Sequence, residues 1–263
     1  MNEVTPVRNA RGFSLVELMV AMAIFLIICA AMFELLQLSQ EKYASENQLS
    51  GTFQEARLAI DQIARDVNDS GYPSLGMFSN IPTNVAAYVS SPVAWSPNYP
   101  TSSCQVGTAG GGTCLTPGDF DLILETTVNG TVSWIRYQLQ GTTLNRAVVP
   151  KTGGDPWGPT SAPGVMVPFL TNVMNNATGQ LAQITATYPS MFPNGLPVPI
   201  FQYTCDTSAS QTPCPIAGAS NSPMNVRDVD ITLIVMTQQP DMQTHTLKLV
   251  ELNGRGHRSN PSY

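Results

Sequence analysis

The sequence lacks what most enzymes and nucleic-acid-binding proteins depend on. Only 11% of its 263 residues are charged, two are histidines, and the 12 Lys and Arg residues form no basic cluster. With a formal net charge of −6, the chain is a poor candidate for nucleic-acid binding. HExxH, nucleophile-elbow and phosphate-loop motifs are all missing. We therefore expect no catalysis and no cofactor, and any attachment to a membrane must be hydrophobic.

Candidate metal ligands are also few. Asp119 with Asp121, and Asp228 with Asp230, each place two carboxylates on one strand face. Calcium would need about six oxygen ligands, so solvated strand faces are the better interpretation, and no metal site is expected. His257 lies in a polar tail, where we expect it to be solvated.

Five cysteines are present, and four of them form two local pairs in polar, Gly- and Pro-rich stretches. Cys104 lies near Cys114, and Cys205 lies near Cys214. This spacing favours two short disulfide loops formed in an oxidising compartment. A zinc site would need all four thiolates to converge, and neither a C-x-x-C spacing nor a nearby histidine supports it. The fifth, Cys29, stands alone in an apolar run.

That apolar run extends from Phe13 to Phe33 and is long enough to cross a membrane. As a helix it would span about 31 Å, the thickness of a bilayer core. Arg8 and Arg11 precede it and Glu34 follows it. By the positive-inside rule, the N-terminus is cytoplasmic and the rest of the chain is exported as a single-pass inner-membrane protein.

A single carboxylate, Glu17, interrupts the apolar run near its start. A cleaved secretory signal would need a small-residue cleavage site, and "ELLQLSQEKYASENQ" after Phe33 fits poorly. A plain membrane anchor leaves Glu17 unexplained, because a carboxylate in hydrocarbon costs at least about 2.5 kcal/mol. A glutamate that reaches the headgroups is a further alternative. The remaining interpretation takes "RGFSLVEL" as one motif.

This motif resembles the class III signal of type IV prepilins, in which a short basic leader ends in glycine. The resemblance implies a leader over residues 1–12 that a prepilin peptidase removes after Gly12. Phe13 would then be the first mature residue and would be N-methylated. Cleavage would expose an amine about one helical turn from Glu17. In a bundle of staggered helices, Glu17 of one subunit could neutralise the Phe13 amine of the next, so burial would favour one docking register.

Helical character continues beyond the apolar run. An apolar stripe recurs at spacings of three and four residues, and no proline occurs between Phe13 and Tyr72. We therefore expect one long helix with a membrane half over 13–36 and an amphipathic half over 37–72, followed by a head over 73–263. The stripe consists of Phe53, Ala56, Ile60, Ile63 and Val67.

The head reads as antiparallel β-structure with long loops. Asn129-Gly130 predicts a tight hairpin turn, and alternating patterns predict strands near 120–127, 132–139, 143–149, 181–188, 228–236 and 245–252. Asn253 would begin a polar tail. A helix followed by an antiparallel sheet is an α+β arrangement and resembles the pilin fold, with the amphipathic half of the helix packed on the sheet.

Three further segments are similar to PilW-type minor pilins and to the related J-type minor pseudopilins of type II secretion. They are "RLAIDQIARDVNDSGYP", "LQGTTLNRAV" and "VRDVDITLIV". The resemblance implies a minor pilin that takes part in pilus assembly or initiation near the tip, with other major and minor pilins as partners. A minor pseudopilin is the close alternative. A membrane-anchored periplasmic enzyme, with a catalytic cluster near His245, is the third hypothesis.

The cysteine spacing gives a first testable prediction. We expect peptide mapping without reduction to recover Cys104 linked to Cys114 and Cys205 linked to Cys214, because each loop closes about ten residues in a flexible stretch. Cross-linked peptides that join the two pairs to each other would contradict this assignment.

Overall fold

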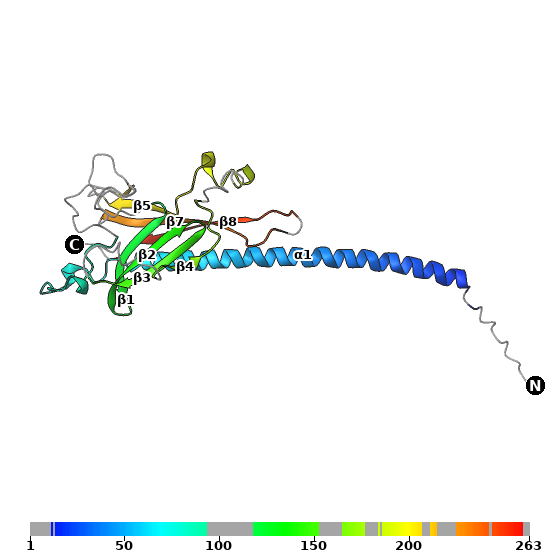
Figure 1. Cartoon of the computed structure of the whole chain (residues 1–263), viewed down its shortest axis with the longest axis horizontal. Coiled ribbons are helices and arrows are strands. Elements are labelled where there is room, and N and C mark those ends of the chain that lie inside the picture. Colours follow the sequence, from blue (N-terminus) through cyan, green and yellow to red (C-terminus); the bar gives the residue numbers. More distant parts are fainter. Residues whose placement is uncertain are drawn as a thin grey trace, which may run out of the picture.

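The computed structural model describes Gly12 and residues 14–93, 118–152, 165–176, 184, 186–206, 211–214, 225–241 and 244–259. One long helix, α1 (Leu15–Asn68), extends out of a β-rich head (Figure 1). The helix contains 54 residues, close to the single long helix that the sequence predicts. Asp69 caps its C-terminus, and Gly71 adopts a φ of 90°, which favours glycine.

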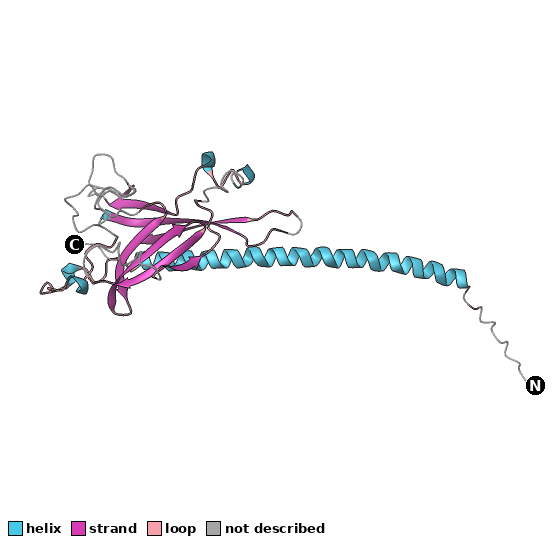
Figure 2. Ribbon diagram, viewed as in Figure 1, coloured by secondary structure: helices cyan, strands magenta, loops and turns pink. Residues whose placement is uncertain are grey.

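The described part of the head contains two four-stranded antiparallel sheets (Figure 2). The first has the order β1-β2-β3-β4 and the second the order β6-β5-β7-β8. Three short 3₁₀ helices lie in the connections, at Leu75–Met77, Val85–Ala87 and Pro193–Gly195. The strands are β1 (Asp121–Val128), β2 (Thr131–Gln140), β3 (Thr143–Pro150), β4 (Val167–Leu170), β5 (Phe201–Asp206), β6 (Gln211–Pro213), β7 (Val226–Met236) and β8 (Leu249–His257).

Local turn chemistry sets the register of the first sheet. Asn129 and Gly130 have φ values of 50° and 81°, as a two-residue hairpin turn requires, and they pair Val128 with Thr131. Gly141, with a φ of 60°, lies in the next turn and pairs Gln140 with Thr143. The three-stranded meander predicted from the sequence is confirmed.

One hydrophobic core joins the helix to both sheets. The buried apolar residues that α1 contributes to it are Ala56, Ala59, Ile60, Ile63 and Val67. Phe53 was expected in the same stripe, but it is 43% exposed, and Thr52 is buried in its neighbourhood instead. The sheets contribute buried residues that include Leu122, Leu124, Ile135 and Leu144 from the first and Tyr203, Val229, Ile231, Leu233 and Val235 from the second.

The last strand differs from the prediction. It covers Leu249–His257 instead of 245–252, so the expected polar tail from Asn253 is in fact the strand that packs most closely on α1. Gly254 and Gly256 make this contact possible: a Cβ on Gly254 would lie 2.2 Å from Ile60 Cγ2, and one on Gly256 would lie 2.5 Å from Val67 Cβ. Because glycine has no side chain, these two positions do not continue the apolar alternation by which a strand is predicted from sequence.

The predicted strand over 181–188 is wrong in the described part of that segment. Ile184, Ala186 and Thr187 are helical, and the Tyr188 N–H donates to the Ile184 carbonyl oxygen at 2.8 Å. Tyr188 packs beside Met174, Phe192 and Ile234 in a second, smaller core cluster. Ile184 and Tyr188 are four residues apart, so one helical turn places both on this cluster.

The close contact of α1 with β8 predicts a steric effect. We expect Gly254→Ala to lower the free energy of unfolding by about 1–3 kcal/mol, because the new methyl group overlaps Ile60. The double variant Gly254→Ala/Ile60→Ala should be less destabilised than the sum of its two single variants, since the smaller side chain removes the overlap. Urea unfolding of the detergent-solubilised chain measures both. As a control, Gly51→Ala meets nothing within 4 Å and should not destabilise.

Candidate functional site

The first turn of α1 contains the carboxylate that the sequence singles out. Ser14 is the N-cap: its Oγ accepts from the Glu17 N–H at 3.3 Å, and its own N–H donates to Glu17 Oε2 at 3.1 Å. This reciprocal pair is a capping box. Sequence reasoning did not identify it, although the S-x-x-E spacing of residues 14–17 is its signature. Gly12 is exposed, and Phe13 lies outside the described residues.

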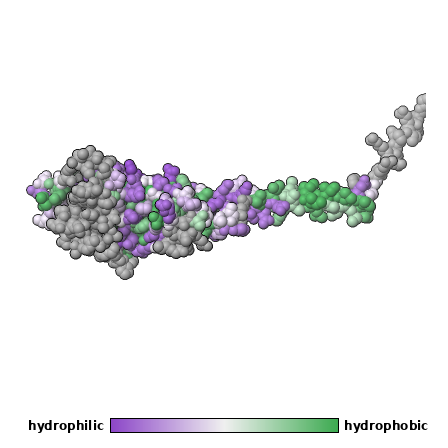
Figure 3. Space-filling model, turned by 90° about the horizontal axis from the view of Figure 1, so that it is seen from above, coloured by the Kyte–Doolittle hydropathy of each residue, from purple (hydrophilic) through white to green (hydrophobic). Residues whose placement is uncertain are grey.

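The N-terminal half of α1 presents apolar side chains to its surroundings. Every residue from Leu15 to Leu38 is exposed, and most of these residues are apolar. Figure 3 shows this continuous hydrophobic surface on the face in view. By length and composition α1 can cross a membrane. Cys29, a free thiol, is part of the exposed surface.

Polar contacts begin immediately after the apolar half. The connection between β7 and β8 reaches back along α1 (Figure 1), and Ser45 Oγ donates to Asp241 Oδ2 at 2.8 Å. Lys248 pairs with the same Asp241 carboxylate and donates to Ser45 Oγ at 3.2 Å. His245 lies in this connection with its side chain exposed. These bonds hold α1 from residue 45 onward and leave the preceding segment free to contact other molecules.

Farther along, a buried polar network fixes the helix to the first sheet. Tyr137 Oη donates to Asp66 Oδ2 at 2.5 Å, and Arg146 donates to both, at 2.9 Å each. Burial, reinforced by the Asp66 carboxylate, raises the pKa of Tyr137 well above its ordinary value, so the phenol stays protonated and acts as a donor. Asp66 was missed by sequence reasoning, because its partners come from strands about 70–80 residues away.

A second buried pair attaches the segment after α1 to the sheet. Glu125 and Lys151 form an ion pair, and both side chains are almost fully buried. Glu125 also accepts from the backbone N–H groups of Ser90 and Ser91, while Lys151 donates to the Tyr88 carbonyl oxygen. Burial raises the pKa of the Glu125 carboxyl, and the Lys151 ammonium opposes that shift. The pair thereby positions residues 88–91, at the end of the segment that follows the helix.

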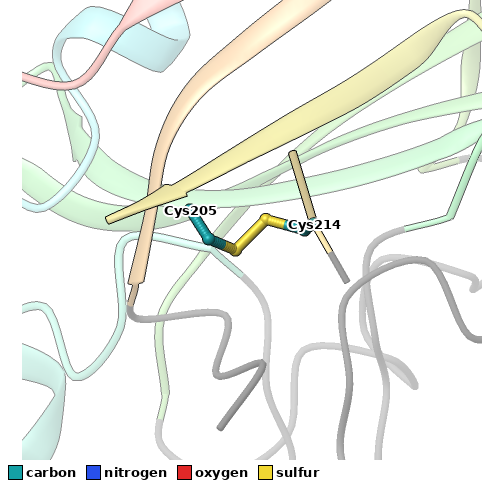
Figure 4. The surroundings of a disulfide bond; sticks show 2 residues. All are labelled: Cys205 and Cys214. Atoms are coloured by element: carbon teal, nitrogen blue, oxygen red, sulfur yellow. A yellow bond between two sulfur atoms is a disulfide. The ribbon is translucent and has the colours of Figure 1, made fainter. Parts of the chain in front are cut away.

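Cys205 of β5 and Cys214, which follows β6, form a disulfide with a Cα–Cα distance of 5.5 Å (Figure 4). The bond closes the β5–β6 hairpin. Cys104 and Cys114 lie outside the described residues.

Asp119 is exposed, as expected, whereas the other three paired aspartates each bond to a basic side chain. Asp121 bonds to Arg136, Asp230 to Arg255, and Asp228, which is buried, to His257 Nδ1 at 2.5 Å. His257 has an exposed side chain, as expected, but it lies at the end of β8 and not in a polar tail, and so it contacts Asp228 of β7. Within the described residues, no group of three or more His, Cys, Asp or Glu side chains is arranged to hold a metal ion.

Residues 7–33 match the prokaryotic N-terminal methylation motif. No curated protein and no solved structure gave a significant match. The matched segment contains Gly12, Phe13 and Glu17 together with most of the exposed apolar surface.

The motif and the fold together support a type IV pilin-like protein. A long N-terminal helix packed on antiparallel sheets is consistent with the pilin fold, and the apolar helix indicates membrane anchoring. The motif implies processing by a prepilin peptidase and assembly with other pilins. Motif and fold indicate a structural protein.

The network between Asp66, Tyr137 and Arg146 predicts a loss of stability. We expect Tyr137→Phe to lower the free energy of unfolding by about 1–2 kcal/mol, because it removes the hydroxyl that bridges the other two groups. The control Tyr43→Phe changes an exposed side chain on α1 and should have no effect. Urea unfolding compares the two variants; equal stabilities would show that the hydroxyl contributes nothing.

Proposed function

We propose that this chain is a minor pilin of a type IV pilus, anchored in the inner membrane with its N-terminus cytoplasmic and its head periplasmic. A prepilin peptidase cuts after Gly12, Phe13 becomes the methylated N-terminus, and the apolar half of α1 joins a bundle of pilin helices. The chain acts in filament assembly or initiation, near the tip. The observation that carries this proposal is Glu17 at the start of an uncovered apolar helix, inside the methylation motif.

The physical role of Glu17 is to select a docking register. Hydrocarbon makes an isolated carboxylate and an isolated ammonium costly, whereas a paired carboxylate and ammonium are tolerated. In the single chain, the carboxylate accepts from the Ser14 N–H. Cleavage after Gly12 creates a stronger, charged donor on each subunit. Glu17 of one subunit then neutralises the Phe13 amine of the next, and the helices stop at the position where both charges meet.

The head supplies the outward surface of the subunit. Disulfide closure braces the β5–β6 hairpin, and the buried Glu125–Lys151 pair holds the end of the segment that follows α1. Rigid sheets with attached loops suit a subunit whose work is binding.

A minor pseudopilin of a type II secretion system is the alternative, since the methylation motif supports a pilin or a pseudopilin equally. Deletion of the chain separates the two: loss of surface pili with normal protein secretion supports the pilus, and loss of secretion with normal pili supports the pseudopilus.

Glu17→Gln tests the electrostatic role without removing the helix cap. Glutamine at this position can complete a capping box, so the helix should still begin at the same residue. Cleavage before Phe13 should also persist, and N-terminal sequencing would show it. Because the charge is lost, we expect at least about a tenfold decrease of the variant in sheared filaments.

Ser14→Ala is the matched control. It removes the capping hydroxyl and keeps the carboxylate, so cleavage and filament entry should both remain close to wild type. Normal incorporation of Glu17→Gln, or an uncut leader on the native protein, would overturn the proposed function.

A further inference from the structure

A groove lies beside the membrane-distal half of α1, on the flank of the helix that faces β4. Its volume is about 600 Å³. Leu58, which is 68% exposed, and Ala59 form its helical wall. Phe169 and Leu170 of the edge strand β4 form the opposite wall. The groove is open and can receive a side chain from another molecule, and its apolar walls are bordered by the polar residues Glu55, Gln62, Arg65 and Thr171.

Phe53 projects from the other flank of the same helix. Successive residues of an α-helix are rotated by about 100°, which places Phe53 about 180° around the axis from the centre of the groove residues Glu55 to Arg65. One molecule therefore presents an aromatic side chain on one flank and a groove with apolar walls on the other. Two parallel copies of such a molecule meet through unlike surfaces, in a heterologous contact that can repeat.

The axial offset between two copies follows from the charge pairing at the membrane. When Glu17 of a first copy meets the Phe13 amine of a second copy, the helices are offset by four residues, or about 6 Å. Each residue of the second copy then lies level with the residue four positions later in the first. Phe53 of the second copy lies level with Arg57 of the first, between Glu55 and Ala59, and therefore at the groove.

Charged residues on α1 fit the same offset. Arg57, Asp61 and Arg65 are spaced by four residues and are exposed. Within the described part of the chain none of their side chains takes part in an ion pair. With no offset, like charges of two copies would lie level. With an offset of four, Arg57 of the second copy lies level with Asp61 of the first, and Asp61 of the second with Arg65 of the first.

We propose that a second copy of this chain docks along α1, with its Phe53 in the groove between α1 and β4 and its charged series offset by four residues. The aromatic side chain, the groove and the alternating charges all belong to one chain. A single axial offset of four residues brings Phe53 level with the groove and opposite charges level with each other. The inference rests on the proposed function, which supplies that stagger.

Cross-linking in membranes of cells that assemble the filament tests this docking. Two differently tagged full-length copies are coexpressed, both with Cys29→Ala to remove the free thiol. One carries Gln54→Cys and the other Leu58→Cys, positions that the offset brings level, and a short thiol-reactive linker joins them. A second pair of chains also carries Arg57→Asp, Asp61→Arg and Arg65→Asp, which inverts the series while keeping its opposite charges four residues apart within the helix.

We expect two copies with the wild-type charged series to cross-link, and likewise two copies with the inverted series. A copy with the wild-type series and a copy with the inverted series should give about tenfold less cross-linked product, because like charges then meet. Phe53→Ala should reduce the cross-link between wild-type series. The docking is wrong if wild-type copies do not cross-link, if the mixed pair matches them, or if two inverted series fail, as they would if the partner were a different pilin.

The Glu17→Gln measurement separates the two proposals. If the cross-link is absent while Glu17→Gln still keeps the chain out of filaments, the proposed function stands and the contact between copies is excluded. If Glu17→Gln enters filaments normally, the proposed function itself fails.

Discussion

The close approach of α1 to β8 determines the shape of the whole molecule. Gly254 and Gly256 let the helix lie against the strand at Ile60 and Val67, so the membrane-distal half of α1 belongs to the head core. The head covers a single side of that half, and it ends before the apolar half begins. Because the helix is continuous, the orientation of its apolar half is fixed relative to the head.

The capping box shows what Glu17 does in the isolated chain. Its carboxylate satisfies a backbone N–H that the helix itself cannot satisfy. In the proposed function, cleavage would give the same carboxylate a second partner, an ammonium on an adjoining subunit, and a charged donor competes well with a neutral one. One glutamate would then support the helix in the isolated chain and select the register in the assembly. The proposed pairing accounts for a carboxylate at the edge of a segment that is otherwise apolar.

Local patterns predicted much of this architecture, and the missed features have specific physical causes. The methylation motif, the long helix and the β1–β3 meander depend on residues close in sequence, and so does the short loop between Cys205 and Cys214. The position of β8 could not be read because its two glycines leave no apolar alternation. Asp66 gave no signal because Tyr137 and Arg146, which make its burial tolerable, lie far along the chain. Phe53 matched the helical period, yet the core extends from Thr52 and Ala56 toward Ala59 and leaves it at the margin.

The buried polar network contributes more than stability, because it fixes how far α1 is rotated on the head. An apolar stripe against an apolar sheet tolerates small rotations, whereas Asp66 can reach Tyr137 and Arg146 in one orientation only. That orientation directs Phe53 to one flank and Leu58 to the other. A rotation by one residue position, about 100°, would bury Phe53 and remove the groove wall. The flanks through which the chain can meet a second copy are thus set inside the head, at Asp66, although neither flank contains that residue.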